Sequence, residues 1–305
     1  MVFWKEKVKM EESKQTFTSF SDKWHQNKTL AFSETLREGS DIFNWIITRN
    51  GFSCSEDFSK YLSSKRHILD AGCGNGRVTA LLHSYSPCEA NLVGIDLTAA
   101  EVAAENLNHL DRVSVSQKDL LDDLSDLGTF DFIYCQEVLH HTTDPKKAFL
   151  NLCSRLDQDG EIAIYVYKKK GPIREFADDL IRDQVSGLTY EDAMGEMEGL
   201  TDLGRALSDL GATVSVPDIK VLGIPAGEYD VQRLLYHFFL KSFWNPKLKY
   251  EENLAINYDW YHPQLCSRHT LEEVLGWFES AQLKVVHSYV DFYGITIRGA
   301  NIGCE

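Results

Sequence analysis

The chain has 305 residues, of which 43% are hydrophobic, so it is long enough and apolar enough to bury a substantial core. Its 46 acidic and 31 basic residues give a net charge of −15, which argues against a protein that grips a nucleic-acid backbone through a basic surface. The sequence has no apolar run of membrane-spanning length and no signal-like start, and its seven irregularly spaced cysteines fit free thiols, so we expect a cytoplasmic protein without a membrane partner.

The first 60 or so residues carry aromatic side chains at helical spacing, as in the runs 17–24 and 42–47. This spacing predicts helices before the first strand. Two interpretations stay open for them. They either pack on the edge of a sheet or form a lid over a ligand, in which case Trp24 and His25 are the residues that we expect to touch it.

A short apolar strand follows and ends in an acid, Asp70, before a glycine loop. The loop has Gly72, Gly74 and Gly76, and a helical pattern begins at about residue 78. Glycine lets a backbone approach a ligand closely, and a helix N-terminus offers free N–H groups to it. A second apolar strand then ends in Asp96, and this combination describes a site for an adenosine-type cofactor.

The glycine spacing separates two classes of cofactor. The dinucleotide fingerprint is G-x-G-x-x-G/A, whereas this loop reads G-x-G-x-G with Arg77 at the position of the third small residue. An acid at the end of the first strand suits a cationic ligand better than a pyrophosphate. The pattern resembles the class I S-adenosylmethionine-dependent methyltransferases, whose first motif is roughly D/E-x-G-x-G-x-G, and a dehydrogenase remains the less favoured reading.

The resemblance continues along the chain and implies the following cofactor contacts. Asp96 and the adjoining Leu97 match the segment that grips the ribose hydroxyls, and Asp119 with Leu120 matches the segment that meets the adenine. Gln136, at the end of an apolar run from residue 130, matches the segment at the methionine end. For two acids a structural reading stays open, because Asp70 could cap the loop and Asp119 could be a turn acid.

Strands and helices alternate from residue 66 to 167, which predicts a mostly parallel sheet. The resemblance implies a Rossmann-like α/β fold, namely a seven-stranded methyltransferase sheet with an antiparallel last strand. Its ending is visible as a helix over 271–281, opened by a capping box, and two strands over 283–290 and 293–298.

About 100 residues separate the fifth strand from this ending, which is far too many for a loop. They contain helical stretches, and we expect an inserted cap over the carboxyl ends of the strands, where open α/β sheets bind ligands. The predicted helices cover 173–185, 190–197, 200–210 and 229–243. The predicted domains are a helical lid over 1–60, a cofactor-binding core over 61–170 and 268–305, and a helical cap over 171–267.

Three clusters are candidates for the acceptor site. His140 and His141 leave the fourth strand, and either ring could act as a base at neutral pH. A basic and aromatic run could hold an anionic acceptor, although it also fits a solvated charge run; it comprises Tyr165, Tyr167, Lys168, Lys169, Lys170 and Arg174. The third cluster is a loop rich in aromatic and titratable groups, with Asp259, Tyr261, His262, Arg268 and His269.

The spacing of His262, His269 and Asp259 matches no standard zinc pattern, so we predict no metal. The sequence thus predicts a methyltransferase that uses S-adenosylmethionine and acts on an oxygen, nitrogen or carbon of a small-molecule acceptor, with an anionic acceptor favoured. Two alternatives remain: an enzyme that uses the same cofactor for another reaction, and a non-catalytic module that binds it. No nucleic-acid partner is expected.

Overall fold

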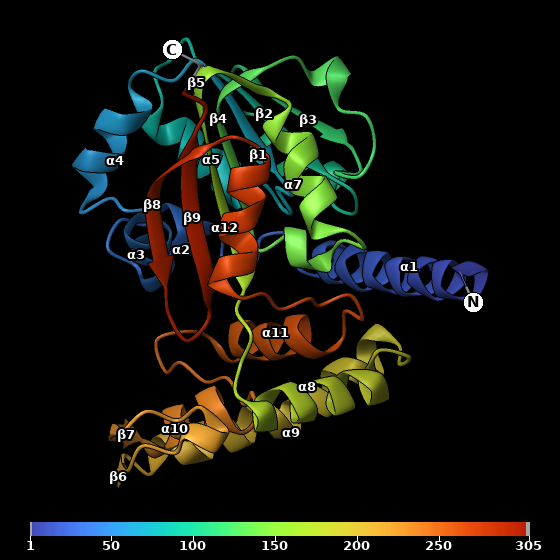
Figure 1. The fold of residues 1–305 in the computed structure, drawn as a ribbon, viewed down its shortest axis with the longest axis vertical. Helices are drawn as coiled ribbons and strands as arrows, with labels where there is room; N and C mark the ends of the chain where they lie inside the picture. The colour runs from blue at the N-terminus through green and yellow to red at the C-terminus, as the bar shows by residue number, and fades with distance from the viewer. Residues whose placement is uncertain (1, 303–305) are drawn as a thin grey trace. The chain divides into compact units, whose positions relative to one another are not determined.

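The computed structural model describes residues 2–302, with side chains from residue 9 onward, and divides into two compact units (Figure 1). The sheet unit takes Trp24–Lys168 and the chain from Ser267, and the helical unit takes the chain up to Lys23 together with Lys169–Cys266. Within the described part of the chain, no helix has both the length and the apolar character needed to cross a membrane.

The sheet unit contains the predicted seven-stranded sheet, in the order β3-β2-β1-β4-β5-β9-β8. Strands β1 to β5 are parallel, while β9 runs antiparallel to both of its neighbours. The strands are β1 (His67–Ala71), β2 (Asn91–Asp96), β3 (Val113–Gln117), β4 (Phe130–Gln136), β5 (Leu156–Tyr167), β8 (Lys284–Val290) and β9 (Gly294–Ala300). The structure thereby confirms the predicted fold class.

The order of the sheet places its switch point at β1, because β2 and β4 lie on either side of that strand. Chain connections leave to opposite sides there, and ligands bind outside the carboxyl ends of such strands. The helices of the sheet unit are α2 (Phe32–Leu36), α3 (Asp41–Arg49), α4 (Ser55–Leu62), α5 (Arg77–Tyr85), α6 (Ala100–Leu107), α7 (Pro145–Cys153) and α12 (Leu271–Ser280).

The side chains of consecutive residues in the central strands pack into two separate apolar cores. Leu69 and Ile133 belong to one apolar cluster with Phe278 of α12, whereas Ile68 and Phe132 belong to another. Side chains alternate between the two faces of a strand, and a parallel sheet buries both faces. Helix starts are fixed by side chains, since Asp144 accepts a hydrogen bond from the Lys147 amide and Thr270 forms the predicted capping box with Glu273.

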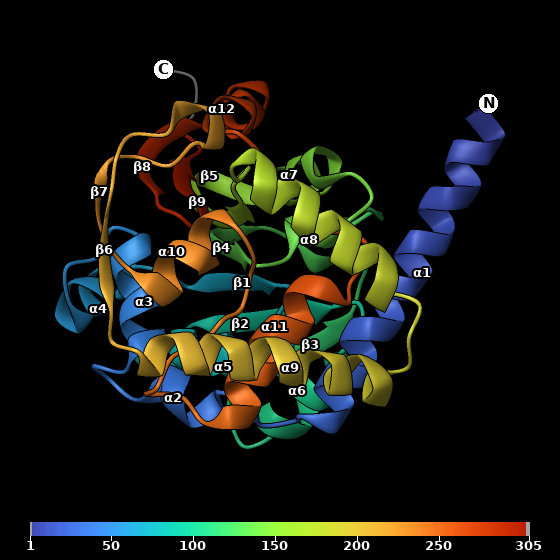
Figure 2. The same cartoon turned by 90° about the horizontal axis from the view of Figure 1, so that it is seen from below.

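The helical unit contains four helices and a two-stranded hairpin in addition to its part of α1 (Val2–Gln26) (Figure 2). They are α8 (Pro172–Val185), α9 (Tyr190–Asp209), β6 (Thr213–Val216), β7 (Gly227–Asp230), α10 (Val231–Phe238) and α11 (Tyr250–Tyr261). Helices α9, α10 and α11 pack together.

Three predictions for this unit are wrong. The stretches predicted as two helices over 190–197 and 200–210 form the single helix α9, which continues through Gly199. The helix predicted over 229–243 covers only 231–238, because residues 227–230 pair with β6 as a strand. The third acceptor cluster was predicted to be a loop, but Tyr258 and Tyr261 are buried in the last turns of α11.

We expect the Phe278→Ala substitution to lower the free energy of unfolding by about 3–5 kcal/mol, because it removes a buried ring from the core and leaves a cavity. Phe278 is fully buried, with its ring centroid 4.8 Å from that of Phe149. Urea unfolding is the measurement. Leu275→Ala on the same helix is the control, and its loss should be much smaller because Leu275 is 36% exposed. Equal losses would contradict the assignment of this core.

Candidate active site

The glycine loop lies between β1 and α5 and is held to the end of β2 by its own backbone. The amides of Gly72 and Cys73 both donate to the carbonyl oxygen of Ile95, at 2.7 and 3.0 Å. All three predicted glycines have positive φ, with +80° at Gly72, +56° at Gly74 and +86° at Gly76. Such angles are strained for a residue with a side chain, which accounts for the glycine at each position.

Neighbouring side chains leave no room for a Cβ at the three glycines of this loop. A Cβ at Gly72 would lie 2.2 Å from Val138, and one at Gly74 would lie 2.9 Å from Cζ2 of Trp24. Trp24 is therefore in contact with the loop inside the sheet unit, while His25 is exposed. The result is a bare stretch of backbone with an indole beside it.

Asp70 is buried at the end of β1, and its Oδ2 accepts a hydrogen bond of 2.6 Å from the Thr79 hydroxyl. Burial raises the pKa of this carboxyl to about 7, and the charge of Asp96 acts in the same direction. The hydrogen bond from Thr79 and the charge of Arg77 oppose that shift. A buried carboxylate is strongly stabilised in its charged form when a cation binds close to it.

Asp96 ties the loop to the next helix. Its Oδ2 accepts from the Gly74 amide at 2.9 Å, and its Oδ1 accepts from the amides of Thr98 and Ala99 at 2.8 Å each. A carboxylate oxygen has two lone pairs, so Oδ2 can still accept from a hydroxyl of a ligand. The residue therefore supports the loop whether or not it also holds a ribose.

The other predicted cofactor contacts lie at neighbouring strand ends. Leu97 is half-buried and its carbonyl accepts from the side-chain amide of Gln117. Asp119 accepts from the backbone amide of Leu121 at 2.9 Å, and Leu120 is buried. Gln136 ends β4 and is buried, donating to the side chain of Asn50 and accepting from the Tyr134 hydroxyl. These residues come from β2, β3 and β4, whose carboxyl ends share one edge of the sheet.

One loop residue that the sequence analysis missed is Asn75, which is fully buried between two of the glycines. Its Nδ2 donates to the carbonyls of Lys28 and Leu30, both at 3.1 Å, so it fastens the loop to the turn before α2. A polar residue between two glycines was the available signal, but its partners lie 45 residues or more away in sequence.

His140 is the least satisfied polar group of the sheet unit. It is fully buried, and neither ring nitrogen has a hydrogen-bond partner among the described residues. Its ring centroid lies 3.7 Å from that of Tyr167 and 4.3 Å from that of His141. Burial lowers the pKa of His140 well below its usual range, and the charges of His141 and His269 lower it further, so the ring is neutral at pH 7.

The chain at the start of α12 braces this histidine. Ser267 donates to the carbonyl oxygen of His140 from its amide at 2.8 Å and from its hydroxyl at 3.2 Å. The same hydroxyl lies 2.9 Å from Nε2 of His269, whose Nδ1 is 3.9 Å from the carboxylate of Glu273. The structure thus brings together His140, His141 and His269.

Tyr261 and His262 lie in the helical unit and are engaged there. The Tyr261 hydroxyl donates to Asp178 at 3.1 Å, while the ring nitrogens of His262 lie 2.8 Å from the Ser19 hydroxyl and 3.2 Å from the Leu188 carbonyl. Both side chains are buried. These contacts are those of packing residues, and they leave neither ring nitrogen of His262 open to a substrate.

The predicted basic run is divided between the units. Tyr165, Tyr167 and Lys168 belong to the sheet unit, whereas Lys169, Lys170 and Arg174 belong to the helical unit. Asp259 is also in the helical unit and pairs with Lys23 at 2.6 Å, while Arg268 lies in the sheet unit. Among the described residues, no group of three His, Cys, Asp or Glu side chains could hold a metal ion.

The residues at the edge of the sheet fit S-adenosylmethionine. The loop has three glycines with positive φ at the carboxyl end of β1, the kind of backbone that a closely approaching ligand requires. The donor groups of the ligand, namely an ammonium, a ribose diol and an adenine amine, match the acceptor oxygens of Asp70, Asp96 and Asp119. Among these features, the buried carboxyl of Asp70, whose pKa is raised by burial, most directly favours a cationic ligand.

Comparison with known proteins agrees with this fit. Residues 62–194 match the family model of a methyltransferase domain. The chain is 26% identical over 262 residues to a ubiquinone biosynthesis O-methyltransferase from Psychrobacter cryohalolentis, covering 79% of this chain and 90% of that protein. It is 30% identical over 125 residues to juvenile hormone acid O-methyltransferase from Bombyx mori, covering 39% of this chain and 45% of that protein.

The chain spans less than half the length of several of the curated relatives that it matches. Among solved structures, PKMT2 from Rickettsia typhi aligns with a TM-score of 0.50 and 14% identity, over 77% of this chain and 48% of that chain, which supports the fold. Residues 62–194 are a methyltransferase domain of the class I, S-adenosylmethionine-dependent family, which confirms the family, the enzyme class and the cofactor predicted from the sequence.

We expect binding of S-adenosylhomocysteine to weaken below pH 7, by up to about tenfold per pH unit, and to release a proton. The carboxyl of Asp70 titrates at about pH 7 in the free protein. Below that pH it is protonated, and a bound ammonium must displace the proton. Calorimetry at pH 6 to 8, in buffers of different ionisation enthalpy, measures both effects. Asp70→Asn should abolish the proton release, and a pH-independent affinity in the unmodified protein would refute this role.

We expect Asp96→Ala to weaken binding of S-adenosylhomocysteine at least tenfold. The substitution removes acceptors from the Gly74 amide and from the first amides beside α6, in addition to any contact with the ribose. Calorimetry is again the measurement. Asp111→Ala is a suitable control because that acid is exposed in the same unit. Unchanged affinity in Asp96→Ala would remove this residue from the site.

Proposed function

We propose that this chain, whose residues 62–194 form a class I S-adenosylmethionine-dependent methyltransferase domain, moves a methyl group to an oxygen of a small, negatively charged acceptor. The observation that carries the proposal is the glycine loop, where bare backbone lies beside the buried carboxyl of Asp70. Two relatives are named as O-methyltransferases, and one of them is named for an acid, which supports oxygen as the target.

The cofactor-binding groups of the proposal come from four successive strand ends. Asp70 would pair with the ammonium, Asp96 would accept from the ribose, and Asp119 would accept from the adenine amine. Gln136 would line the methionine end. When bound, S-adenosylmethionine supplies an electrophilic methyl group on a positively charged sulfur.

Transfer of a methyl group from sulfur is an in-line displacement, so the protein must mainly place the acceptor atom and keep water away. A hydroxyl acceptor must also lose its proton, and a nearby base then accelerates the step. His140 suits that role because it is neutral, buried and has no hydrogen-bond partner in the described part of the chain. The neutral imidazole nitrogen takes the hydroxyl proton as the acceptor oxygen gains the methyl group, and the imidazolium that forms then loses that proton to solvent.

Two neighbours would position this base. Ser267 fixes the backbone of His140 through its amide and hydroxyl, and the ring of Tyr167 lies against the imidazole. The charges of His141 and His269 oppose protonation of the ring, so His140 is neutral before the step, and the negative charge of the proposed acceptor would stabilise the imidazolium that forms. His269 is held in turn by Ser267 and Glu273, so we propose it as a positioning residue.

The negative charge of the acceptor follows from the basic residues that continue β5. Lys168, Lys169 and Lys170 come directly after the strand whose end carries Tyr165 and Tyr167. In a chain with a net charge of −15, such a run is a local exception. A negatively charged acceptor would be attracted to these side chains and repelled by most of the remaining surface.

We expect His140→Gln to lower kcat by about a hundredfold or more with hydroxyl acceptors, because glutamine cannot accept the proton. The affinity for S-adenosylhomocysteine should stay within about twofold. The assay follows methyl transfer from labelled S-adenosylmethionine to a panel of small hydroxy acids. His67→Gln is the matched control, since His67 is exposed at the amino end of β1. A full rate in His140→Gln would exclude it as the base, and no transfer to any oxygen acceptor would overturn the proposed function.

A further inference from the structure

A group of positive charges surrounds one indole ring inside the helical unit. Trp260 of α11 is 3% exposed. Three cationic groups lie over its ring: Nζ of Lys241 at 4.4 Å from the centroid, Cζ of Arg174 at 5.5 Å, and Nζ of Lys170 at 5.7 Å. Cations are attracted to the face of an indole, but three of them also repel one another.

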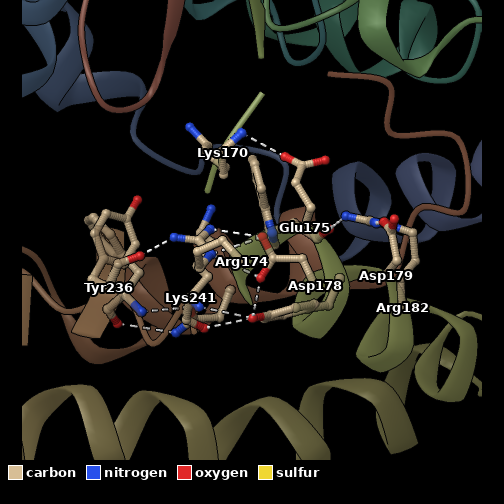
Figure 3. A network of polar contacts seen from close by, with 12 residues as sticks. Lys170, Arg174, Glu175, Asp178, Asp179, Arg182, Tyr236 and Lys241 are labelled. Carbon is tan, nitrogen blue, oxygen red and sulfur yellow. Dashed lines mark hydrogen bonds and ion pairs between the residues drawn. The ribbon is translucent and has the colours of Figure 1, made fainter. Parts of the chain in front are cut away.

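The charge of Arg174 is already neutralised. Its guanidinium forms hydrogen bonds of 3.0 and 3.1 Å with the carboxylate of Asp178 and an ion pair of 2.9 Å with the same group. Its remaining nitrogen donates to the carbonyl of Tyr236. Asp178 is fully buried and also accepts from the Tyr261 hydroxyl. This set is complete, and Figure 3 shows it as one connected network.

Lys241 is different. Its side chain is 7% exposed, and no hydrogen bond or ion pair reaches Nζ from the residues that the structure describes. Its backbone is fixed, because the Tyr261 hydroxyl contacts both its amide and its carbonyl, at 3.1 and 3.2 Å. The fold therefore holds an ammonium in place and gives it an aromatic face but no counter-ion.

Leaving such a group buried without a counter-ion is costly. Burial lowers the pKa of Lys241 to about 8, and the charge of Arg174 acts in the same direction. The charges of Asp178 and Asp259 oppose the shift. The amine is still mostly protonated at pH 7, so the charge persists under ordinary conditions.

We propose that Nζ of Lys241, seated on Trp260 and beside the Arg174–Asp178 pair, binds the carboxylate of a small molecule. The three cations over the ring outnumber the one carboxylate paired with Arg174, so the cluster carries an excess of positive charge that an anion balances. The guanidinium of Arg174 already forms its paired hydrogen bonds with Asp178, so it cannot also bind a phosphate dianion through two N–H groups. This site lies within the helical unit alone, and it is independent of the proposed function.

The test uses the full chain, with benzoate as the carboxylate probe and inorganic phosphate as the competing anion. Ligand-observed NMR titration measures both affinities in the unmodified protein and in three variants. Lys241→Met should weaken benzoate binding at least tenfold, and Lys241→Arg should keep it within a few fold. Lys220→Met, which removes an exposed lysine of the same unit, should leave it unchanged.

Three outcomes would overturn the inference: equal benzoate affinity in Lys241→Met, no binding of benzoate to the unmodified chain at millimolar concentration, or preference for phosphate. If Lys241→Met does not fold, ¹³C-methylated lysines in the unmodified chain serve instead. Benzoate should then raise the pKa of Lys241 towards its usual value, and an unmoved pKa contradicts the proposal.

The same variants separate this inference from the proposed function. Lys241→Met should bind S-adenosylhomocysteine as tightly as the unmodified chain, since Asp70, Asp96 and Asp119 are unaltered. Methyl transfer without carboxylate binding at Lys241 would refute the inference alone. Carboxylate binding at Lys241 in a chain that transfers no methyl group would support the site and refute the proposed function.

Discussion

The contact on which the rest of the site depends is the pair of hydrogen bonds from Gly72 and Cys73 to the carbonyl oxygen of Ile95. They fix the first turn after β1 to the end of β2, and so they set the distance between Asp70 and Asp96. Asp96 reinforces the same link from its side chain by accepting from the Gly74 amide. A cofactor held by both carboxylates therefore meets acceptors whose separation is set by the backbone of the sheet.

This arrangement explains why the glycine positions of the loop cannot tolerate side chains. Val138 follows β4, and Trp24 comes from α1, yet both stand where a Cβ on the loop would be. The loop is thus enclosed by the strand that carries Gln136 and by the indole, in addition to its own helix. Asn75 adds a third fastening, to the turn before α2. Rigid placement of ligand groups is what binding and catalysis both require.

The sheet, the glycine loop and the acids at strand ends could be predicted because each is encoded by neighbouring residues. Alternation in apolar runs marks the strands, and Asp70 lies two residues from the first glycine. The remaining features depend on residues distant in sequence. Gln136 pairs with Asn50, Trp24 lies on Gly74, and Lys241 meets Trp260, and no local pattern indicates any of these contacts. Tyr261 and His262 show the converse, since a titratable run that looked like a loop is the buried end of a helix.

Each unit holds one buried charge that the chain itself does not fully balance. In the sheet unit it is the carboxyl of Asp70, with a threonine hydroxyl as its hydrogen-bond partner and a pKa of about 7. In the helical unit it is the ammonium of Lys241, with an indole face and a pKa of about 8. A buried charge at either group lowers the stability of the folded protein, and a bound ligand of opposite charge restores that stability. Two such groups of opposite sign fit the two ligands that we propose, a cationic cofactor and a carboxylate, and each would discriminate against neutral molecules at its own place.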